Sequence, residues 1–519
     1  MSVKNIVKKN RYLDSVLLML VSNQIKELHG IVKASVMMGT DNNRELLASD
    51  GLLTGEGKEA GPNDLLIALS LEDNGDPDKI LLEIEKFLSS KRKASNEETG
   101  SITPKSIESA LNIMDANMVV ISLPGDYARW EAEKALMNGL HVMLFSDNVS
   151  VEDEIELKTL AREKGLLLMG PDCGTSIINN VALGFANILN RGNIGIVGAS
   201  GTGIQEVTCL ITNAGFGISQ AIGTGGRDLS VRVGGLTMIG ALEALIEDGD
   251  TEIILLISKP PSPEVEERIL ELLENCPKPF IINFLGGNEE KSKKMGYKVA
   301  KTLEEAAHMA IALVKKEDYK KVDFNYPVDE IKALAEKEYS KFSHDQKYIR
   351  GLYSGGSVCE EANIVLDDLG VRINSNAPIR EELKLKNSKK SVKHTFVDMG
   401  DDEFTRGVPH PMIDFTLRKE RIIEEAKDPE CAVILMDVVL GLGAHENPAG
   451  EIASAVVKAK KIAGEEGRYL SCVASITGTA KDPQNRENQK KILEDAGVIV
   501  MPSNARAARF SAIVVGREA

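Results

Sequence analysis

The sequence predicts an α/β protein with mostly parallel sheets, preceded by a small α+β domain. From about residue 104 onward, predicted strands and helices alternate along the chain. Several of the strands end in Gly-rich loops that lead directly into helices, and the order of these loops recurs in the second half. Alternating strands and helices are typical of parallel sheets, in which ligands bind at the carboxyl ends of the strands.

The composition is that of an ordinary globular protein. The chain has 519 residues, enough for roughly three domains, and 43% of the residues are hydrophobic while 27% are charged. The net charge of −16 argues against nucleic acid and anionic membranes, because both require a basic surface on the protein. We therefore expect neither as a partner.

Cysteines and apolar segments indicate the compartment. The six cysteines are widely spaced and form no C-x-x-C pair, which is typical of reduced thiols. Cys173 and Cys359 lie beside Gly-rich turns, but neither has a His near it in the sequence, so we favour structural roles over nucleophilic ones. The N-terminus has no signal-peptide pattern, and apolar runs such as residues 16–21 are too short to cross a bilayer. We expect a cytoplasmic protein.

Residues 1–95 are predicted to form the small α+β domain. Strands are expected at residues 14–21, 32–38 and 64–71, and helices at residues 22–30 and 76–88. The second helix opens with Asp-Pro-Asp, a typical helix start. Residues 91–103 are polar and charged, and we interpret them as a linker or an exposed loop.

Residues 104–190 form the first unit with a βαβ pattern. Helices are expected at residues 107–114, 127–138 and 150–163, and strands at residues 118–123, 141–145 and 166–169. The last strand leads into residues 170–176, which read Gly-Pro-Asp-Cys-Gly-Thr-Ser.

Residues 191–316 open with an apolar strand, a loop of small residues and a helix. The loop places Ser200, Gly201, Thr202 and Gly203 at the helix N-terminus. Free N–H groups and the positive end of the helix dipole favour an anion there, and the hydroxyls add donors. This pattern predicts a phosphate site, with an ordinary capped helix as the alternative.

Two later strands of this unit also end at candidate residues. The strand at residues 218–223 leads into Gly225, Gly226 and Arg227, which we expect near the phosphate. The strand at residues 253–258 ends at Lys259, before two prolines that hold the chain in place. Lys259 is a candidate catalytic or substrate-contacting ammonium group.

Residues 345–519 repeat the same order of elements, after an interdomain helix and linker at residues 317–347. Ser354, Gly355, Gly356 and Ser357 follow the first strand and are predicted phosphate contacts. Gly441, Gly443 and His445 follow the strand at residues 432–440 and are expected to close the site, with His445 as a candidate catalytic group. An exposed or merely hydrogen-bonded His is the alternative. The recurring order predicts a diverged internal duplication.

The acidic loop at Asp398, Asp401 and Asp402 admits two interpretations. These carboxylates could act in acid–base chemistry or hold a metal, but a charged loop beside a Gly turn is the interpretation we prefer. We therefore expect no metal site.

These motifs together resemble the two subunits of succinyl-CoA synthetase. Residues 170–173, 194–206, 215–217 and 223–226 resemble its α subunit, and residues 348–445 resemble the carboxy-terminal domain of its β subunit. The known family with this fused layout is FdrA, often labelled an NDP-forming acyl-CoA synthetase. The resemblance implies a CoA-binding Rossmann-like domain at 104–190, in degenerate form, and two flavodoxin-like ligase-CoA domains at 191–316 and 345–519. It also implies that two helix N-termini face a shared phosphate, those at Ser200–Gly203 and at either Ser354–Ser357 or Gly441–His445.

The chain departs from the synthetase pattern at three places. Residues 285–290 read Leu-Gly-Gly-Asn-Glu-Glu, without the His that the α subunit phosphorylates. The Glu that steadies this His falls at or beside Lys259, and no Gly-rich turn for CoA precedes residue 104. No Walker-type loop is found either. These departures make CoA a doubtful ligand, and the sequence identifies no cofactor with certainty.

The resemblance to FdrA implies a subunit of an oxamate carbamoyltransferase in allantoin and purine breakdown. That enzyme interconverts oxalurate plus phosphate with oxamate plus carbamoyl phosphate. An acyl-CoA synthetase component without the phosphohistidine and a non-catalytic scaffold are the alternatives. We expect phosphate or carbamoyl phosphate as substrate, a small anionic substrate beside it, and further protein subunits or a homo-oligomer.

Overall fold

The computed structural model describes most of the chain. The described residues are 2–11, 30–49, 51–72, 82–86, 104–287, 289–321, 328–405 and 408–516, together with residues 18, 21, 25, 28 and 80. The chain divides into two compact units, one of residues 1–116 with 406–409 and one of the remaining residues. Each unit is described by itself below.

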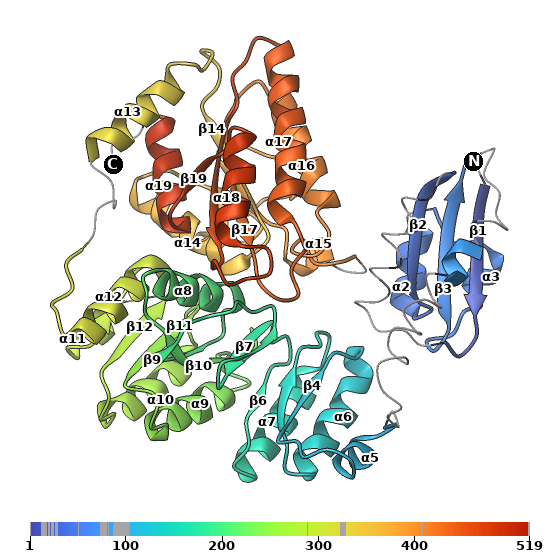
Figure 1. The fold of residues 1–519 in the computed structure, drawn as a ribbon, viewed down its shortest axis with the longest axis vertical. Coiled ribbons are helices and arrows are strands. Elements are labelled where there is room, and N and C mark those ends of the chain that lie inside the picture. The colour runs from blue at the N-terminus through green and yellow to red at the C-terminus, as the bar shows by residue number, and fades with distance from the viewer. Residues whose placement is uncertain are drawn as a thin grey trace. The chain divides into compact units, whose positions relative to one another are not determined.

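The first unit contains an antiparallel sheet in the order β1-β3-β2 (blue in Figure 1). Its strands are β1 (Ser2–Lys8), β2 (Ile31–Met38) and β3 (Leu65–Leu71), and the described helices are α2 (Asp41–Ser49), α3 (Gly55–Lys58) and α5 (Ile107–Leu111). All seven residues of β3 are buried because it is the central strand. This arrangement agrees with the predicted α+β class.

The sequence prediction is wrong at the start of this unit. Leu18 and Val21 are helical, although a strand was expected at residues 14–21, and the strand β1 was not predicted. Residues 16–21 are rich in Leu and Met, which favour helix over strand. β1 is half polar, and it is held by its pairing with β3 rather than by its own pattern. Most of the helix expected at 22–30, in which Ile25 is helical, and much of that at 76–88 lie outside the described residues.

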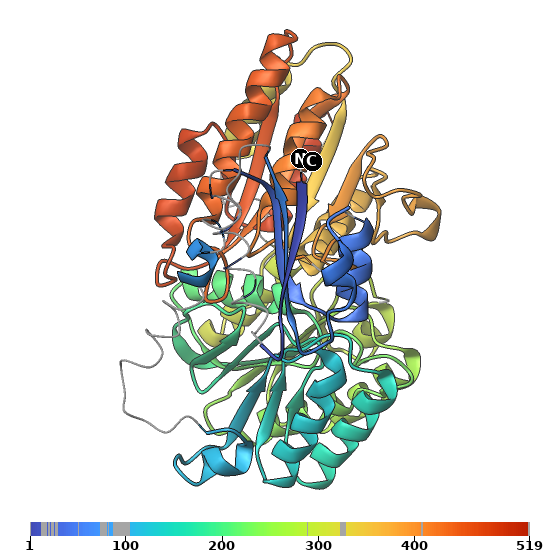
Figure 2. The ribbon, with the colours of Figure 1, turned by 90° about the vertical axis from the view of Figure 1, so that its right-hand side faces the viewer.

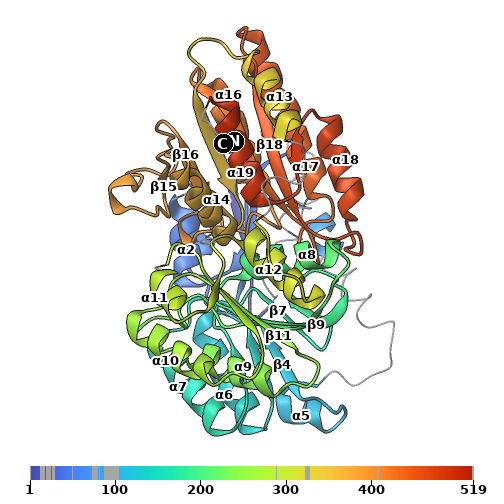
Figure 3. The same ribbon diagram turned by 90° about the vertical axis from the view of Figure 1, so that its left-hand side faces the viewer.

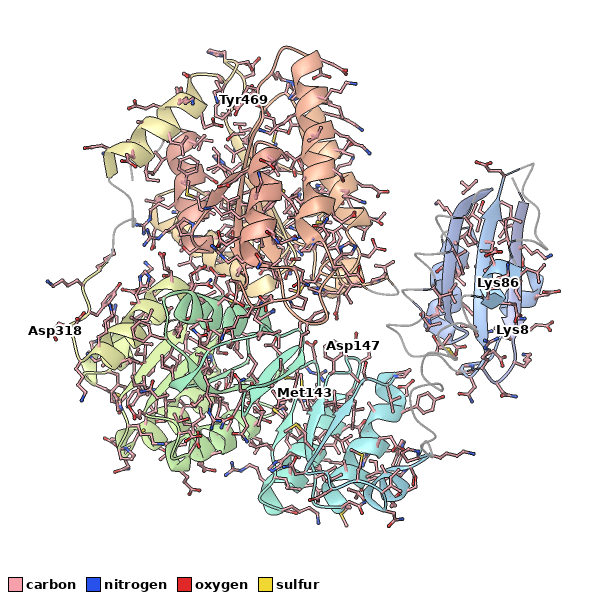
Figure 4. The ribbon with its side chains drawn as sticks, viewed as in Figure 1. Lys8, Lys86, Met143, Asp147, Asp318 and Tyr469 are labelled. Carbon is pink, nitrogen blue, oxygen red and sulfur yellow. The ribbon has the colours of Figure 1, made fainter. Side chains whose placement is uncertain are left out.

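The second unit begins with a parallel sheet in the order β4-β5-β6. Its elements are β4 (Met118–Ile121), α6 (Gly125–Met137), β5 (His141–Leu144), α7 (Val151–Glu163) and β6 (Leu168–Met169). Figure 2 shows these strands and their helices in cyan, and Figure 4 labels Met143 within β5 and Asp147 in the loop that follows it. This is the expected βαβ pattern for residues 104–190.

A hairpin after this sheet joins the next one. β7 (Thr175–Ile178) and β8 (Val181–Gly184) pair with each other, and β7 pairs antiparallel with β10. The larger sheet has the order β13-β12-β11-β9-β10-β7-β8. Residues 175–184 therefore extend the sheet of the following domain, which begins earlier in the chain than residue 191.

Two sheets of the second unit share one strand order. The first contains β9 (Arg191–Gly198), β10 (Ile218–Gly223), β11 (Ile253–Ser258), β12 (Phe280–Phe284) and β13 (Lys298–Val299), and the second contains β14 (Tyr348–Tyr353), β15 (Asn374–Ser375), β16 (Thr395–Asp398), β17 (Cys431–Val439), β18 (Ser471–Thr477) and β19 (Ile499–Met501). The orders β10-β9-β11-β12-β13 and β16-β14-β17-β18-β19 are both 2-1-3-4-5, the flavodoxin-like order. The fold class predicted from the sequence is confirmed.

Helices cover these two sheets and separate them. Those of the first sheet are α8 (Gly201–Asn213), α9 (Leu236–Glu247), α10 (Pro263–Glu274), α11 (Glu289–Lys294) and α12 (Leu303–Lys315), followed by α13 (Val328–Tyr339). Those of the second are α14 (Gly356–Asp368), α15 (Asp402–Thr405), α16 (Thr416–Lys427), α17 (Pro448–Glu465), α18 (Arg486–Asp495) and α19 (Asn504–Val514), with a short 3₁₀ helix at Glu381–Leu383. α8, α12, α14 and α19 lie between the two sheets, and their apolar faces form one continuous core (Figure 3).

The two halves exchange buried carboxylates across this helical layer. Glu206, the sixth residue of α8, accepts a hydrogen bond from the Asn504 N–H at the start of α19 (3.1 Å). Glu361, the sixth residue of α14, accepts one from the Leu303 N–H at the start of α12 (2.7 Å). Each half therefore caps the last helix of the other.

None of the helices in the part of the chain that the structure describes is long and apolar enough to cross a membrane.

The buried Glu361 predicts a pH-dependent stability. Burial, together with the nearby Glu206 carboxylate, raises the pKa of Glu361 to about 8. A group with a raised pKa stabilises the folded state below its unfolded pKa and loses this contribution as the pH rises through the folded pKa. Replacing Glu361 by Gln removes the titration, so the fall in melting temperature between pH 5 and pH 9 should become smaller by roughly 3 °C.

Thermal unfolding of both proteins across this range measures the effect. Glu420→Gln, at an exposed position of α16, is the matched control and should follow the wild type. An equal fall in wild type and Glu361→Gln would contradict the assignment.

Candidate functional site

The N-termini of α8 and α14 meet at the carboxyl edges of the two matched sheets. The Ser200 hydroxyl donates a hydrogen bond to Ser357 Oγ (2.6 Å), and each residue is only 6% exposed. Thr202 packs on Gly355, where a Cβ atom would lie 2.7 Å from Thr202 Cγ2. Ser200 and Gly355 are the N-cap residues, while Thr202 and Ser357 are the second residues of their helices. The two contacts are thus related by the duplication.

The first turns of both helices offer backbone donors. In α8 these are the N–H groups of Gly201, Thr202 and Gly203, and in α14 those of Gly356, Ser357 and Val358. None of these six has an acceptor among the described residues. Gly201, Thr202 and Gly356 are partly exposed, whereas Gly203, Ser357 and Val358 are buried. Converging helix N-termini with unused N–H groups favour binding of an anion.

The hydrogen-bond donors of Ser354 and Gly355, which precede α14 in the chain, already have a partner. The Ser354 N–H and hydroxyl and the Gly355 N–H all donate to the Asp437 carboxylate (2.8, 2.8 and 3.0 Å). Asp437 is fully buried and pairs with Arg418 at 2.9 Å. An internal carboxylate therefore takes the donors of these two predicted phosphate contacts, and Gly356 and Ser357 are the available contacts of this loop.

Asp398, the last residue of β16, lies against the first turn of α14. Its Oδ1 accepts the Gly400 N–H (2.9 Å), and its Oδ2 would lie 2.7 Å from a Cβ atom on Gly356. The residue is 8% exposed, and burial raises the pKa of its carboxyl to about 7. The sequence interpretation preferred a charged loop residue over an acid–base group, and the structure places Asp398 at the end of a strand, in a buried position. Its position at the end of the strand beside the first strand was the available signal.

Lys259 extends toward the same turn from the end of β11. Its Nζ lies 3.6 Å from Glu360 Oε2 on α14, and its side chain is 54% exposed. Burial raises the pKa of Glu360. The positive charge of Lys259 lowers the pKa of Asp398, against the effect of burial. The structure thus places Lys259 against Glu360 of α14, as an exposed ammonium paired with a carboxylate.

His410 borders the site next to Gly400. A Cβ atom on Gly400 would lie 2.9 Å from His410 Nε2, and His410 Nδ1 accepts the Met412 N–H (3.2 Å). This hydrogen bond assigns the ring proton to Nε2. Burial lowers the pKa of His410 to about 4, so the ring is neutral at physiological pH. In the sequence, the two prolines that flank His410 did not indicate that it lies beside Gly400.

The loop with Gly441, Gly443 and His445 joins the halves elsewhere. The Leu442 N–H donates to Ala186 O (2.8 Å), and the Gly441 N–H donates to Gln484 Oε1 (3.0 Å). Gly443 packs on Phe185. His445 Nδ1 accepts the Asn447 N–H (3.0 Å), and the ring packs on Phe415. None of the described contacts of these residues is with the first turn of α8.

The loop with Gly225, Gly226 and Arg227 connects the first βαβ unit to the second. Gly225 has φ +87° and packs on the Pro171 carbonyl, an approach that excludes a side chain. Arg227 donates to Val149 O (2.8 Å) and lies 3.0 Å from Glu154. Beside it, the buried Lys158 pairs with Glu154 and Asp228 (2.9 and 2.7 Å). The described partners of Arg227 therefore belong to this junction.

Other chemistry has less support in the structure. Burial raises the pKa of Cys173 to about 11 and that of Cys359 well above its usual value, so neither thiol ionises at neutral pH. No group of His, Cys, Asp and Glu in the described part of the chain is arranged to hold a metal ion.

Comparisons with known proteins identify three segments. Residues 1–104 match a family described as the AllF heavy metal-associated domain, residues 190–286 match the CoA binding domain, and residues 352–514 match CoA-ligase. The CoA-binding match falls on the second βαβ unit, and the assignment of residues 104–190 as a degenerate CoA-binding domain stays a prediction. Residues 1–104 contain no cysteine, so no thiolate ligand for a metal is present there.

Relatives along the whole chain and along parts of it were found. YahF of Escherichia coli strain K12 is 46% identical over 507 residues, 97% of each chain. The succinate–CoA ligase α subunit of Methanothermobacter thermautotrophicus is 28% identical over 208 residues, 40% of this chain and 69% of the relative. The apo acetyl-CoA synthetase 1 of Ca. Korarchaeum cryptofilum matches with a TM-score of 0.31 and 15% identity, over 81% of this chain and 87% of the other.

The full-length match and the order of the three segments agree with the fused layout expected from the sequence. The chain belongs to the FdrA family, whose members join an AllF-type heavy metal-associated domain to CoA-binding and CoA-ligase domains of the succinyl-CoA synthetase type.

Proposed function

We propose that this protein is an acyl-transferring enzyme that binds the phosphate of its substrate between the N-termini of α8 and α14. The observation that carries the proposal is the set of unused N–H donors on two helices joined by the Ser200–Ser357 hydrogen bond. Fixed donors of this kind stabilise the negative charge that develops during acyl or phosphoryl transfer. In this proposal Lys259 contacts the second, carboxylate-bearing substrate.

The relatives favour an acyl-CoA synthetase type of reaction. The matched segments are CoA-binding and CoA-ligase domains, and the curated relatives of the α8 half are succinate–CoA ligase α subunits. In this reaction the acyl group would be transferred between phosphate, as an acyl phosphate, and a thiol, as an acyl thioester. A nucleotide site and a phosphorylated His would be supplied by a further subunit, because residues 285–290 contain no His.

Phosphate-dependent carbamoyl transfer is the second candidate. It converts oxalurate and phosphate to oxamate and carbamoyl phosphate, and it needs neither ATP nor a phosphorylated enzyme. The loop at residues 285–290 without His favours this candidate, because the chain then has no place in that loop to carry the phosphoryl group.

The described cysteines are all free thiols, in keeping with action in the cytoplasm.

Ligand-dependent melting temperatures separate the two candidates. A ligand that binds the folded state raises its apparent stability, by about 2.7 kcal/mol at one hundred times the dissociation constant. An acyl-CoA synthetase component should be stabilised by CoA and by phosphate. A carbamoyltransferase should be stabilised by carbamoyl phosphate and not by CoA. Stabilisation by none of these ligands would contradict both candidates.

Replacing Ser200 by Asp should abolish phosphate binding and leave the fold intact. Asp is a good N-cap residue, so α8 should still form, but its carboxylate would repel the anion. A like charge at this distance costs several kcal/mol, so we expect the affinity to fall by at least about a hundredfold. Isothermal titration of phosphate measures the loss. Ser454→Asp, at an exposed position of α17, is the control and should bind as the wild type does. Unchanged affinity in Ser200→Asp would show that the loop is only a helix cap.

A further inference from the structure

The strongest unexplained feature of the site is the free oxygen of the Asp398 carboxyl. Oδ1 accepts the Gly400 N–H, whereas Oδ2 accepts no hydrogen bond from the described residues. Oδ2 lies against Gly356, the first residue of α14. The side chain is more than nine-tenths buried. A carboxyl oxygen with no hydrogen-bond donor among the described residues, on a residue that is 8% exposed, therefore lies beside the N–H groups that await an anion.

This arrangement contains an electrostatic conflict. The helix N-termini attract an anion, but an ionised carboxylate beside them repels it. A proton between the two groups removes the conflict, because a protonated oxygen on one side can donate a hydrogen bond to the other. Inorganic phosphate carries at least one proton at neutral pH, whereas sulfate, of the same shape, carries none.

The duplicated half shows that the carboxyl is not required by the fold. Gly198 and Tyr353 both lie two residues before the N-cap of their helices, and their neighbours on the adjoining strands are Gly223 and Asp398. A side chain at residue 223 is excluded by the Thr175 carbonyl. One half therefore presents bare donors, and the other presents donors with a carboxyl.

We propose that Asp398 shares one proton with the anion bound between α8 and α14, and that it thereby selects phosphate over sulfate. This inference rests on the proposed function and specifies the residue that recognises the phosphate. The α8 half supplies donors to the unprotonated oxygens, and Asp398 faces the oxygen that carries the proton.

The charged and titratable groups around Asp398 permit the exchange of this proton. Burial raises its pKa to about 7, while Lys259 opposes the shift and Asp401 and Asp437 add to it. The groups that face it from the neighbouring elements are Lys259 after β11, Glu360 on α14, Asp401 in the next loop, Asp437 on β17 with its partner Arg418 on α16, and His410 beside Gly400. His410 is neutral, so it does not compensate the charge of Asp398.

The same proton has a role in the proposed acyl transfer. When a phosphate oxygen attacks the acyl carbon, an O–C bond forms and the C–S bond of a thioester, or the C–N bond of a carbamoyl donor, breaks. The proton leaves the attacking oxygen for Asp398 Oδ2, and the leaving sulfur or nitrogen then takes a proton from Asp398. Atoms and charges balance without a further reactant in either reaction.

The test compares phosphate and sulfate binding to the full chain by isothermal titration at pH 6, 7 and 8. Wild type should prefer phosphate at pH 8 by at least about tenfold, the factor expected from one hydrogen bond to a charged group. Its preference should increase with pH, because ionised Asp398 repels sulfate but accepts the proton of phosphate. Asp398→Asn should bind both ions within about threefold of each other, and the pH dependence left in the ratio should be only that of the second ionisation of phosphate itself, because no protein charge titrates there. Asp345→Asn, at an exposed turn, is the matched control and should behave as the wild type.

The outcomes distinguish this inference from the proposed function. A preference for phosphate that persists unchanged in Asp398→Asn, while Ser200→Asp abolishes binding, overturns the role of Asp398 and leaves the anion site. Absence of phosphate binding in the wild type overturns both.

Discussion

The reciprocal contact between α8 and α14 is the constraint on which the rest of the second unit depends. Each helix brings its N-terminal turn against that of the other and buries a glutamate five residues further on. Burying a carboxylate is costly unless it is hydrogen-bonded, and here the first-turn N–H groups of α12 and α19 satisfy both. Sliding one half along the other would break the hydrogen bonds from the Leu303 N–H to Glu361 and from the Asn504 N–H to Glu206. The two anion-attracting turns are therefore held together by the packing of the halves.

The turn before α14 is held in place by a second buried charge. Asp437 receives three hydrogen bonds from Ser354 and Gly355 and pairs with Arg418, all of them buried. Removing one member of such a pair leaves an uncompensated charge, so the network acts as one structural unit. Its effect on the site is electrostatic. The Asp437 carboxylate offsets part of the positive charge at the N-terminus of α14. In the other half, the residue that corresponds to Asp437 is the apolar Ile257, which follows Leu256 in β11. The two helix ends are therefore unequal in charge although they are related in structure.

The sequence predicted much of this architecture because the relevant signals are local. Apolar strands followed by small-residue loops and helices mark the first crossover of each half, and the repeated order of these loops predicted the duplication. β1 and the hairpin at residues 175–184 were missed because their pairing with β3 and β10 determines them. The burial of Asp398 and His410 was not predicted for a related reason, since it depends on which strands and loops become neighbours. Gly441 and Gly443 have the composition of a phosphate loop, but the loop between β8 and β9 occupies that face.

Divergence of the two halves explains how a symmetrical scaffold can support a directional reaction. An anion between two identical helix ends would have no preferred orientation. Here the edge of the α8 half is closed at Gly223 by the β7 hairpin, while the edge of the α14 half carries Asp398, with Lys259 and Glu360 beside it. The bare helix end attracts the charged oxygens. The ionised carboxyl can accept a hydrogen bond only from an oxygen that bears a proton, and the protonated carboxyl can donate one only to an oxygen that does not. In the proposed reaction the attacking oxygen would then lie on the side of Lys259, where a second, negatively charged substrate would be held. The asymmetry follows from two strand-end residues, Gly223 and Asp398, on a framework that is otherwise duplicated.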